Sequence, residues 1–507
     1  MKKKLLSCVL AALICLQPAS TVLAEDLDLG DSSGILAETN TSSETNTELP
    51  SAPANSEPES TDIVSDTVSD DSVSDDSVSD DSASDDSVSD DSAYVTPEEP
   101  DVSASASAAT ADELTQDFSD DSADTLQQEP DDGSAADLEA DFEDGNALSA
   151  GDNTTTDGFQ YTTSGLTATI TKYNGTATNV TVPEKIDNYT VTKIGSCAFS
   201  DNITLTSVII SDSVTEIERM AFSGCSALKS MKLPSKLKKL GYAFISGTPI
   251  TSLTIPATLT SCGYNSNYGG GPLGNAESLT SLTIESGMET IPDHLAHFSN
   301  DSSHLLSISI PDSVTRISDS AFYKCQKLTS VSLPDSLQYI GSCSFQYCIS
   351  LEEITIPKNV KTIYSSAFDG CSALSSLSFT QNTKTGFYLS VNSSAFSNCI
   401  ALKNIAFSTN VSYLGSYAFY GCSSLTSLEL PDSIIEIDNL AFSKCSALES
   451  LKLPSKLKKL GYAFISGTPI TSLTIPATLT SCGYNSNYGG GPLGNAESLT
   501  SLTIESG

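Results

Sequence analysis

The sequence predicts a β-rich repeat solenoid of about 13 coils, each 22 or 23 residues long, preceded by a disordered acidic arm. Two observations support this prediction. The dipeptide Ala-Phe returns at a nearly constant spacing between residues 198 and 464, which is the signature of a stacked repeat array. The charge is concentrated in front of the array, because residues 25–157 hold 40 Asp or Glu and no Lys or Arg. The net charge of −40 therefore lies in one segment, and the array is nearly neutral.

Residues 1–24 have the pattern of a secretory signal peptide. Lysines at positions 2–4 give a positive start, residues 5–16 are apolar, and small residues suit cleavage after Ala24. The apolar stretch is too short for a membrane-spanning helix, and no later segment is long enough. We therefore expect a secreted, cell-surface or extracellular protein with no membrane span in these residues.

Residues 25–157 have the composition of a disordered, Ser/Asp-rich tether. Within them, residues 68–92 repeat a five-residue unit, Val/Ala-Ser-Asp-Asp-Ser. So few apolar groups and so much like charge cannot offset the entropy cost of ordering the chain. A spacer is the favoured role, and weak calcium binding by the paired aspartates is the alternative. A neutral domain with an acidic arm also argues against nucleic-acid binding, which needs a basic face.

Residues 158–190 are expected to form an N-terminal β cap. Apolar and polar residues alternate over residues 159–173, the pair Asn174-Gly175 suits a hairpin turn, and residues 180–182 continue the strand pattern. The first coil of a solenoid exposes apolar edge atoms, so a hairpin at this place would cover them.

The solenoid is expected to span residues 191–507. Six or seven residues after most Ala-Phe pairs comes a run Leu-x-x-Leu-x-Leu, whose apolar residues alternate as in a short strand. Proline often ends the run because it has no N–H to donate to a ladder. A Val-x-x-Ile station then returns the chain. The thirteen runs begin at Leu205, Leu228, Ile250, Leu279, Leu305, Leu328, Leu351, Leu374, Leu402, Leu425, Leu448, Ile470 and Leu499.

The repeated pattern Leu-x-x-Leu-x-Ile-Pro-x-Ser-Val-x-x-Ile-x-x-x-Ala-Phe-x-x-Cys resembles the BspA-like leucine-rich repeats of bacterial surface proteins. Residues 308–325 come close to it, and the resemblance covers about residues 160–507. It implies a parallel sheet on the concave side of a curved solenoid. It also implies a secreted or surface-displayed binding protein that adheres to host matrix, other cells or glycans, with a protein or glycan ligand as partner.

Residues 232–287 and 452–507 are identical at all 56 positions, at an offset of 220. The second copy stops where the first continues, and a solenoid that ends mid-array leaves its last coil uncovered. We therefore expect the solenoid to be truncated at Gly507. A catalytic domain beyond that point would make the solenoid the targeting module of a secreted enzyme, and a structural cell-surface component is a third hypothesis.

Two clusters of residues could carry chemistry. Cysteines follow the phenylalanine station by three residues in seven coils, and we expect buried thiols rather than disulfides, because parallel side chains suit the disulfide torsion poorly. All three histidines, His294, His297 and His304, fall in one irregular coil that we expect to be exposed. The alternative is a metal site, since His294 and His297 would share one face of a helix, but no glutamate follows His294 as in zinc proteases and no third ligand is evident. No nucleophile elbow or phosphate loop occurs, so we predict no catalytic residue, metal or cofactor. The seven cysteines are Cys225, Cys325, Cys348, Cys371, Cys399, Cys422 and Cys445.

The residues shown are therefore expected to bind rather than to catalyse. Outward positions of the runs carry mostly hydroxyls, which suit β structure and solubility and would also suit a polar face for glycans or peptides. A stretch rich in Tyr, Asn and Gly interrupts the array twice; such side chains suit recognition, and a flexible loop without a ligand is the alternative. The candidate residues are Thr254, Thr283, Ser309, Ser332 and Thr355 for the hydroxyl face, and Tyr264, Asn265, Asn267, Tyr268, Tyr484, Asn485, Asn487 and Tyr488 for the two loops.

Overall fold

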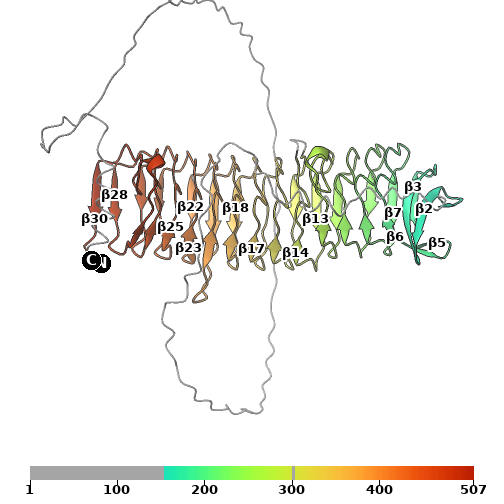
Figure 1. Cartoon of the computed structure of the whole chain (residues 1–507), viewed down its shortest axis with the longest axis horizontal. Coiled ribbons are helices and arrows are strands. Elements are labelled where there is room, and N and C mark those ends of the chain that lie inside the picture. The colour runs from blue at the N-terminus through green and yellow to red at the C-terminus, as the bar shows by residue number, and fades with distance from the viewer. Residues whose placement is uncertain (1–152, 300–302, 507) are drawn as a thin grey trace, which may run out of the picture. The chain divides into compact units, whose positions relative to one another are not determined.

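The computed structural model describes residues 153–299 and 303–506, which form short strands and turns stacked coil upon coil in chain order (Figure 1). The expected signal peptide lies outside the described residues, as does the acidic arm up to residue 152. Within the described ranges, no helix has the length and apolar character needed to cross a membrane. The predicted leucine-rich repeat fold, rich in parallel strands, is confirmed.

The predicted Leu-x-x-Leu-x-Leu runs form parallel strands along one side of the coils, which we call the Leu-run strands. Their side chains alternate between the core and the surface, so that Leu282 and Ile284 are buried while Thr283 between them is exposed. These strands are β4 (Asn179–Val182), β7 (Ser207–Ile210), β9 (Ser230–Lys232), β11 (Ser252–Ile255), β13 (Ser281–Ile284), β15 (Ser307–Ser309), β18 (Glu353–Ile356), β20 (Ser376–Phe379), β22 (Asn404–Ala406), β24 (Ser427–Glu429), β26 (Ser450–Lys452), β28 (Ser472–Ile475) and β30 (Ser501–Ile504).

The run that begins at Leu328 is an exception, because no strand forms in it; the Leu-run ladder is interrupted there, between β15 and β18, and also after β9, β22 and β26. The next coil still contacts this run, since Glu352 N donates a hydrogen bond of 3.1 Å to Thr329 O. Leu328 itself is fully buried, so the run keeps its place in the core without the full ladder.

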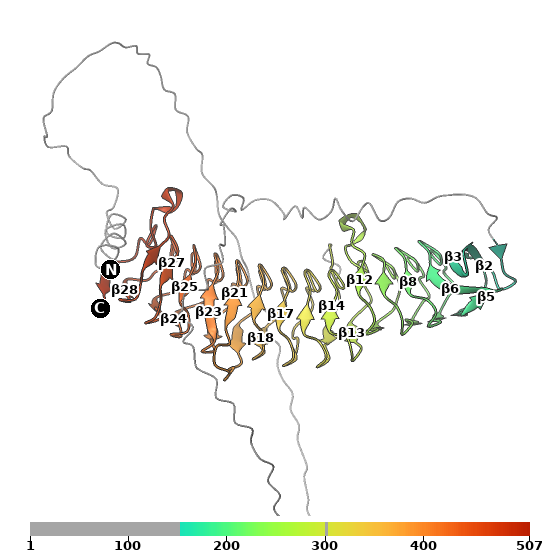
Figure 2. The same ribbon diagram turned by 60° about the horizontal axis from the view of Figure 1, so that its bottom comes forward.

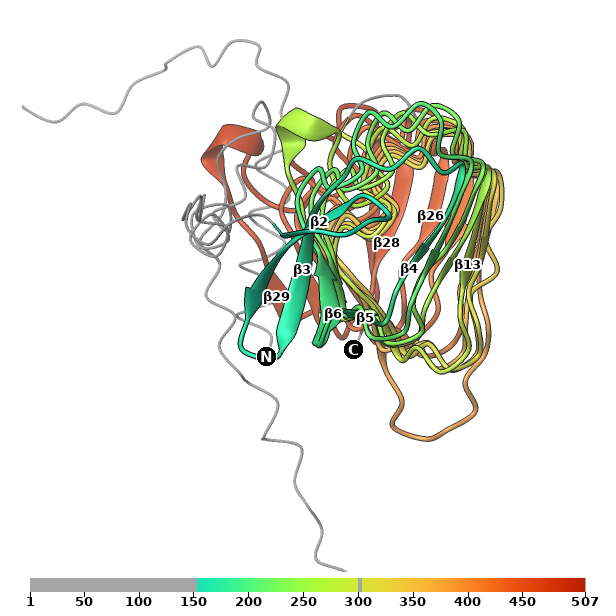
Figure 3. The same cartoon turned by 90° about the vertical axis from the view of Figure 1, so that its right-hand side faces the viewer.

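The Val-x-x-Ile stations, from which the sequence predicts only a return of the chain, form a second set of parallel strands, which we call the return strands. Most are two residues long, with a buried aliphatic residue after an outward one, and Figure 3 shows them on the opposite side of the coils from the Leu-run strands. They are β6 (Tyr189–Ile194), β8 (Glu216–Ile217), β10 (Lys239–Leu240), β12 (Ser261–Cys262), β14 (Thr290–Ile291), β16 (Arg316–Ile317), β17 (Tyr339–Ile340), β19 (Thr362–Ile363), β21 (Leu389–Val391), β23 (Val411–Leu414), β25 (Glu436–Ile437), β27 (Lys459–Leu460) and β29 (Ser481–Cys482).

The N-terminal hairpin differs in one respect from the prediction. It consists of β2 (Phe159–Ser164) and β3 (Thr167–Tyr173), which turn at Gly165-Leu166 and not at Asn174-Gly175. The expected turn was wrong because Gly165 supplies a positive φ of 60°, while the chain beyond β3 crosses to the first Leu-run strand, β4. Two shorter strands, β1 (Asn153–Thr154) and β5 (Lys185–Ile186), pair with β2 and β6.

A column of phenylalanine rings forms the centre of the array. The rings of Phe345, Phe368 and Phe396 are fully buried, their neighbouring centroids lie 5.2 Å apart, and their planes are parallel within 2°. The column continues through Phe419 and Phe442 at spacings of 5.5 and 5.6 Å. This repeated contact explains why Ala-Phe is the clearest mark of the repeat: from Phe345 to Phe442 the ring of one coil packs on the ring of the next.

The predicted burial of the seven cysteines is confirmed, since each is 0 % exposed, and all are free thiols in the structure. Burial raises the pKa of the Cys225 thiol to about 11. Burial likewise raises the pKa of Cys371 well above its ordinary value. Buried thiols of this kind behave as small apolar side chains.

Candidate ligand-binding surfaces

The hydroxyl side chains predicted on the Leu-run strands lie in register on the outer face of the coils. Thr254, Thr283 and Ser309 are cross-strand partners on β11, β13 and β15, and all three are exposed. A second row runs beside them, with Ser307 Oγ at 3.5 Å from Ser281 Oγ. Over these three strands the face is uncharged and presents hydroxyls at a strand spacing of about 4.8 Å.

This hydroxyl face is less continuous than the sequence suggested. Thr355 and Ser378 share a hydrogen bond of 2.8 Å across β18 and β20, but Ser332 lies in the run without a strand and is exposed outside the register. Charges also interrupt the face, since Lys452 and Glu429 form an ion pair between β26 and β24. The uncharged surface is therefore divided into stretches of a few strands each.

The two Tyr/Asn stretches form ordered turns, each containing a short 3-10 helix: η1 (Ser266–Tyr268) and η2 (Ser486–Tyr488). In the first, the Asn265 side chain accepts a hydrogen bond of 3.0 Å from Asn267 N. Asn265 and Gly270 also exchange backbone hydrogen bonds of 2.9 and 3.0 Å, and Gly270 adopts a φ of 104°. The same contacts recur around Asn485, so the glycines close a defined turn in both copies.

Both turns project from the same side of the coils (Figure 2). They follow β12 and β29, which are nine strand positions apart along the return strands. At about 4.8 Å per strand, the two turns are about 43 Å apart. The duplication therefore places two copies of one loop on one side of the array, at a distance that a single large ligand or a densely coated surface could span.

The two loops have the same sequence but expose different tyrosines. In the first loop Tyr268 is 47 % exposed, and it stacks on Tyr242 at 5.6 Å between ring centroids. In the second loop Tyr484 is 71 % exposed. Tyr488, the counterpart of Tyr268, packs on Tyr462 with 5.5 Å between ring centroids. It is half-buried, whereas Tyr268 is exposed.

Neighbouring coils cause this difference. Tyr417 lies in a coil before the second copy. The residue at the corresponding position before the first copy is Cys197. Tyr417 packs against Tyr462 and Tyr488, and burial together with a hydrogen bond to Tyr488 raises the pKa of Tyr417. The second loop thus has an extra aromatic ring on one side, which covers part of Tyr488.

The first loop is instead supported on its other side by the histidine coil. The ring of Tyr264 stacks on His294 at 4.4 Å and meets the edge of His297 at 4.6 Å. His297 is only 6 % exposed and stacks on Tyr323 at 4.3 Å, so the prediction that these histidines lie in an exposed coil was wrong for His297. Burial lowers the pKa of His297 to about 3, and the charges of His294 and Lys324 act in the same direction.

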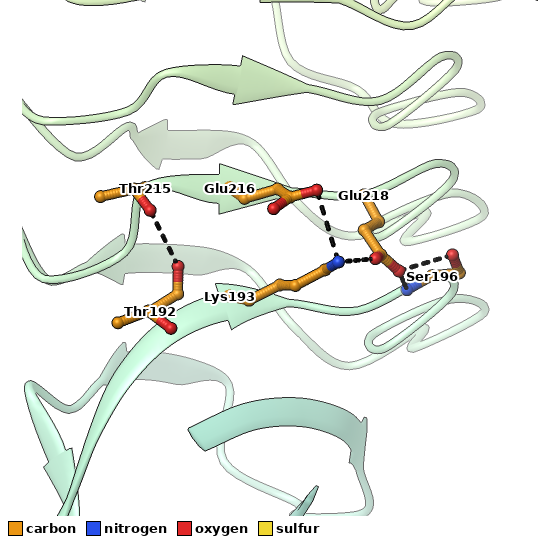
Figure 4. Close-up of polar contacts among 6 residues, drawn as sticks. All are labelled: Thr192, Lys193, Ser196, Thr215, Glu216 and Glu218. Atoms are coloured by element: carbon orange, nitrogen blue, oxygen red, sulfur yellow. Dashed lines mark hydrogen bonds and ion pairs between the residues drawn. The ribbon is translucent and has the colours of Figure 1, made fainter. Parts of the chain in front are cut away.

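The return strands carry charged residues on their outer face, a feature that sequence reasoning missed. Lys193 forms ion pairs with Glu216, at 3.4 Å, and with Glu218 (Figure 4). Glu218 also accepts hydrogen bonds of 2.7 and 2.8 Å from the backbone N and the Oγ of Ser196. In the sequence, these opposite charges are 23 and 25 residues apart. The spacing points to an ion pair only when one coil is known to bring residues about 23 positions apart side by side.

The described parts of the chain, residues 153–299 and 303–506, contain no group of three or more His, Cys, Asp or Glu side chains placed to hold a metal ion. The candidate residues form two outer surfaces on opposite sides of the coils, namely the hydroxyl face of the Leu-run strands and the two Tyr/Asn loops beside the return strands (Figure 3). Both surfaces expose side chains that can contact a ligand.

Comparison with protein families matches the chain to the BspA type leucine-rich repeat region, in six copies over residues 173–270, 295–388 and 388–490. These segments make up more than half of the 507 residues. No curated protein matches the chain in sequence.

Solved structures of similar proteins include three bacterial proteins, of which the first two are described as leucine-rich. One from Bacteroides ovatus is 24% identical, with 70% of this chain and 100% of that chain covered and a TM-score of 0.44. A leucine-rich cell surface protein from Faecalibacterium prausnitzii is 26% identical, with 71% and 96% covered and a TM-score of 0.35. The pneumococcal vaccine antigen PcpA is 20% identical, with 70% and 98% covered and a TM-score of 0.41.

Proposed function

This chain belongs to the BspA-type leucine-rich repeat family, and from that premise we propose that it is a secreted or surface-displayed binding protein that adheres to host matrix, other cells or glycans. The role is recognition of a protein or glycan ligand and not catalysis. The observation that carries the proposal is the duplicated Tyr/Asn loop, present twice on the same side of the array.

Two identical loops on one rigid array favour multivalent attachment. When the first loop has bound a surface that displays many copies of a ligand, the second loop is held near further copies, which raises its effective concentration. Modest individual affinities then combine into firm attachment. Tyrosine and asparagine suit each contact, since the ring offers rigid apolar area and the amide offers adaptable hydrogen bonds.

The experiment is binding of the full chain to a panel of immobilised host matrix proteins and a glycan array, at low and high ligand density. Tyr268→Ala and Tyr484→Ala remove the most exposed ring from the first and second loop, and the double variant removes both. Tyr388→Ala is the matched control, because Tyr388 is 62 % exposed in a different loop.

We expect saturable binding to at least one member of the panel. Each single variant would lose retention mainly at high ligand density, by about 100-fold or more if the loops act together. The double variant would lose binding at every density, and Tyr388→Ala would bind like the unaltered chain. Equal binding by the double variant would exclude the loops as the adhesive surface. A complete lack of saturable binding would instead favour the structural cell-surface role.

A further inference from the structure

Two histidine rings meet edge to face beside the first Tyr/Asn loop. The Nδ1 atoms of His294 and His297 lie 3.4 Å apart, and their ring planes are inclined at 67°. The contact is a long hydrogen bond, beyond the usual range for an N–H donor, which ends near about 3.2 Å, and either ring can be the donor. It agrees with the separation of about 3.3–3.4 Å between two nitrogens that bind one tetrahedral ion at about 2.0–2.1 Å each.

We propose that His294 and His297 form a binding site for a divalent transition-metal ion such as Zn²⁺, held between their Nδ1 atoms. Neutral imidazole is a preferred ligand for zinc, copper and nickel ions. Two protein ligands leave the remaining coordination positions to water or to a group on a bound partner. The proposal is independent of the adhesive role, because it requires no contact with a surface ligand.

The backbone around the two histidines is fixed by the coils on either side. His294 N donates to Asp319 O at 3.1 Å in the following coil, and Gly271 N donates to His297 O at 2.9 Å from the preceding one. Glycine is required at position 271, because a Cβ atom there would lie 1.8 Å from His294 O. The glycine stretch of the first loop therefore lets the chain approach the histidine coil closely enough to hold it in one conformation.

The ring orientations are fixed as well. His294 is stacked on Tyr264, with 4.4 Å between centroids, and His297 is stacked on Tyr323, with 4.3 Å. Flanking rings of this kind restrict rotation about the side-chain bonds. The two Nδ1 atoms are therefore already in position before an ion binds. A preorganised pair binds more tightly than two free side chains at the same spacing.

The sequence permits a single pair of this kind. The chain has three histidines, and the third, His304, is exposed. The second copy of the loop repeats Tyr264 as Tyr484, but no histidine occurs within residues 305–507. A metal bound by this pair would therefore have a stoichiometry of one ion per chain, which separates it from diffuse binding along the acidic arm.

The test is calorimetric titration of the full chain with Zn²⁺, accompanied by the visible absorption spectrum of bound Co²⁺, which distinguishes nitrogen from thiolate ligands. A background of Mg²⁺ occupies the carboxylates of the arm, since hard cations prefer oxygen ligands. His294→Gln and His297→Phe each remove one ligand nitrogen, and the phenylalanine keeps a ring on Tyr323. His304→Gln is the matched control.

We expect one Zn²⁺ per chain, a Co²⁺ spectrum without thiolate bands, and an affinity that falls by about 10- to 100-fold or more in either ligand variant. His304→Gln would retain the unaltered affinity. The proposal is overturned if neither ion binds saturably in the presence of Mg²⁺, or if His294→Gln binds as tightly as the unaltered chain. Should His297→Phe fail to fold, His294→Gln decides alone, because His294 is half-buried at the edge of the coil.

Discussion

The Sγ of Cys371 donates a hydrogen bond of 3.2 Å to the backbone carbonyl of Phe345, in the preceding coil. The same bond joins other cysteines of the ladder to the phenylalanine of the coil before, including Cys348 to Phe322 and Cys445 to Phe419. Cys325 differs in donating to Ala296 O, and each of the other ladder cysteines donates to the phenylalanine carbonyl of the preceding coil while filling a small apolar space. The recurrence of cysteine at this station follows from that double requirement.

Alkylation of the folded protein should therefore distinguish the ladder from the half-exposed thiols. We expect Cys197, which is half-buried, to react with iodoacetamide well before Cys371 at about pH 8, because the thiolate is the nucleophile and Cys371 is a buried neutral thiol. Mass spectrometry of a labelling time course would measure the order. Simultaneous labelling of both cysteines in the folded chain would contradict the structure.

The thiol ladder should also make the protein less stable in alkali. The folded state keeps Cys225 protonated up to a pKa of about 11, while an unfolded thiol loses its proton near its ordinary value of 9.0. The stabilisation is therefore complete below the unfolded pKa and is lost as the pH rises through the folded pKa. Urea unfolding at increasing pH would test this, and Cys225→Ala should show a smaller alkaline loss than the unaltered chain.

Phe368→Ala should cost about 3–5 kcal/mol, because it removes a fully buried ring from the middle of the column and leaves a cavity. Coils of a repeat array depend chiefly on their neighbours, so the loss should appear first as faster amide exchange in the adjacent coils. Tyr388→Ala, at an exposed ring, should change stability by less than about 0.5 kcal/mol. Uniform exchange along the whole array in Phe368→Ala would argue against local coupling.

Glu218→Gln should reduce stability by about 1 kcal/mol near neutral pH, since a neutral amide pairs less strongly with Lys193 and Ser196. Burial raises the pKa of Glu218, but the hydrogen bonds from Lys193 and Ser196 and the charge of Lys193 outweigh it and hold the pKa below its ordinary value. The carboxylate's contribution is present above the unfolded pKa and is lost as the pH falls through the folded pKa. Unfolding curves of the two proteins should therefore converge in acid; a constant difference would refute the assignment.

A substitution on the hydroxyl face can distinguish an effect on ligand binding from an effect on stability. Thr283→Val removes the central hydroxyl of the row on β11, β13 and β15 and keeps a β-branched side chain, so we expect a change of at most about 0.5 kcal/mol in stability. If this face contacts the ligand, binding should weaken without any change in melting temperature. Thr503→Val, at the position equivalent to Thr283 in the second copy, provides the matched comparison.

The repeat register was predictable because each coil repeats the same burial requirement. The Leu-x-x-Leu-x-Leu pattern located twelve of the thirteen predicted runs as strands, and β4 adds one coil before them. The return strands were missed because two residues, such as Arg316 and Ile317, are too few to show an alternation. The hairpin turn was misplaced because Asn174-Gly175 has the same composition as a true turn, and only the parallel pairing of β3 with β6 excludes it.

The candidate loops could be found from composition and duplication, but their surroundings could not. Tyr264 and Tyr484 have identical neighbours in sequence over many residues, and they differ only through coils that lie outside the repeated segment. The burial of His297 arises in the same way, from contacts with Tyr264 and Tyr323 in the adjoining coils. The burial of a side chain by a neighbouring coil can be predicted only when the stacking of the coils is known, even where the sequence already reveals the fold.

The duplicated segment also has a consequence for inheritance. The offset of 220 residues corresponds to nine whole coils, so residues 232–287 and 452–507 occupy equivalent positions in the stack. Misaligned crossing-over between the two gene segments would delete or add nine coils and leave every junction in a sequence context that already occurs in the chain. Such an event would change the length of the array in one step and would require no new core.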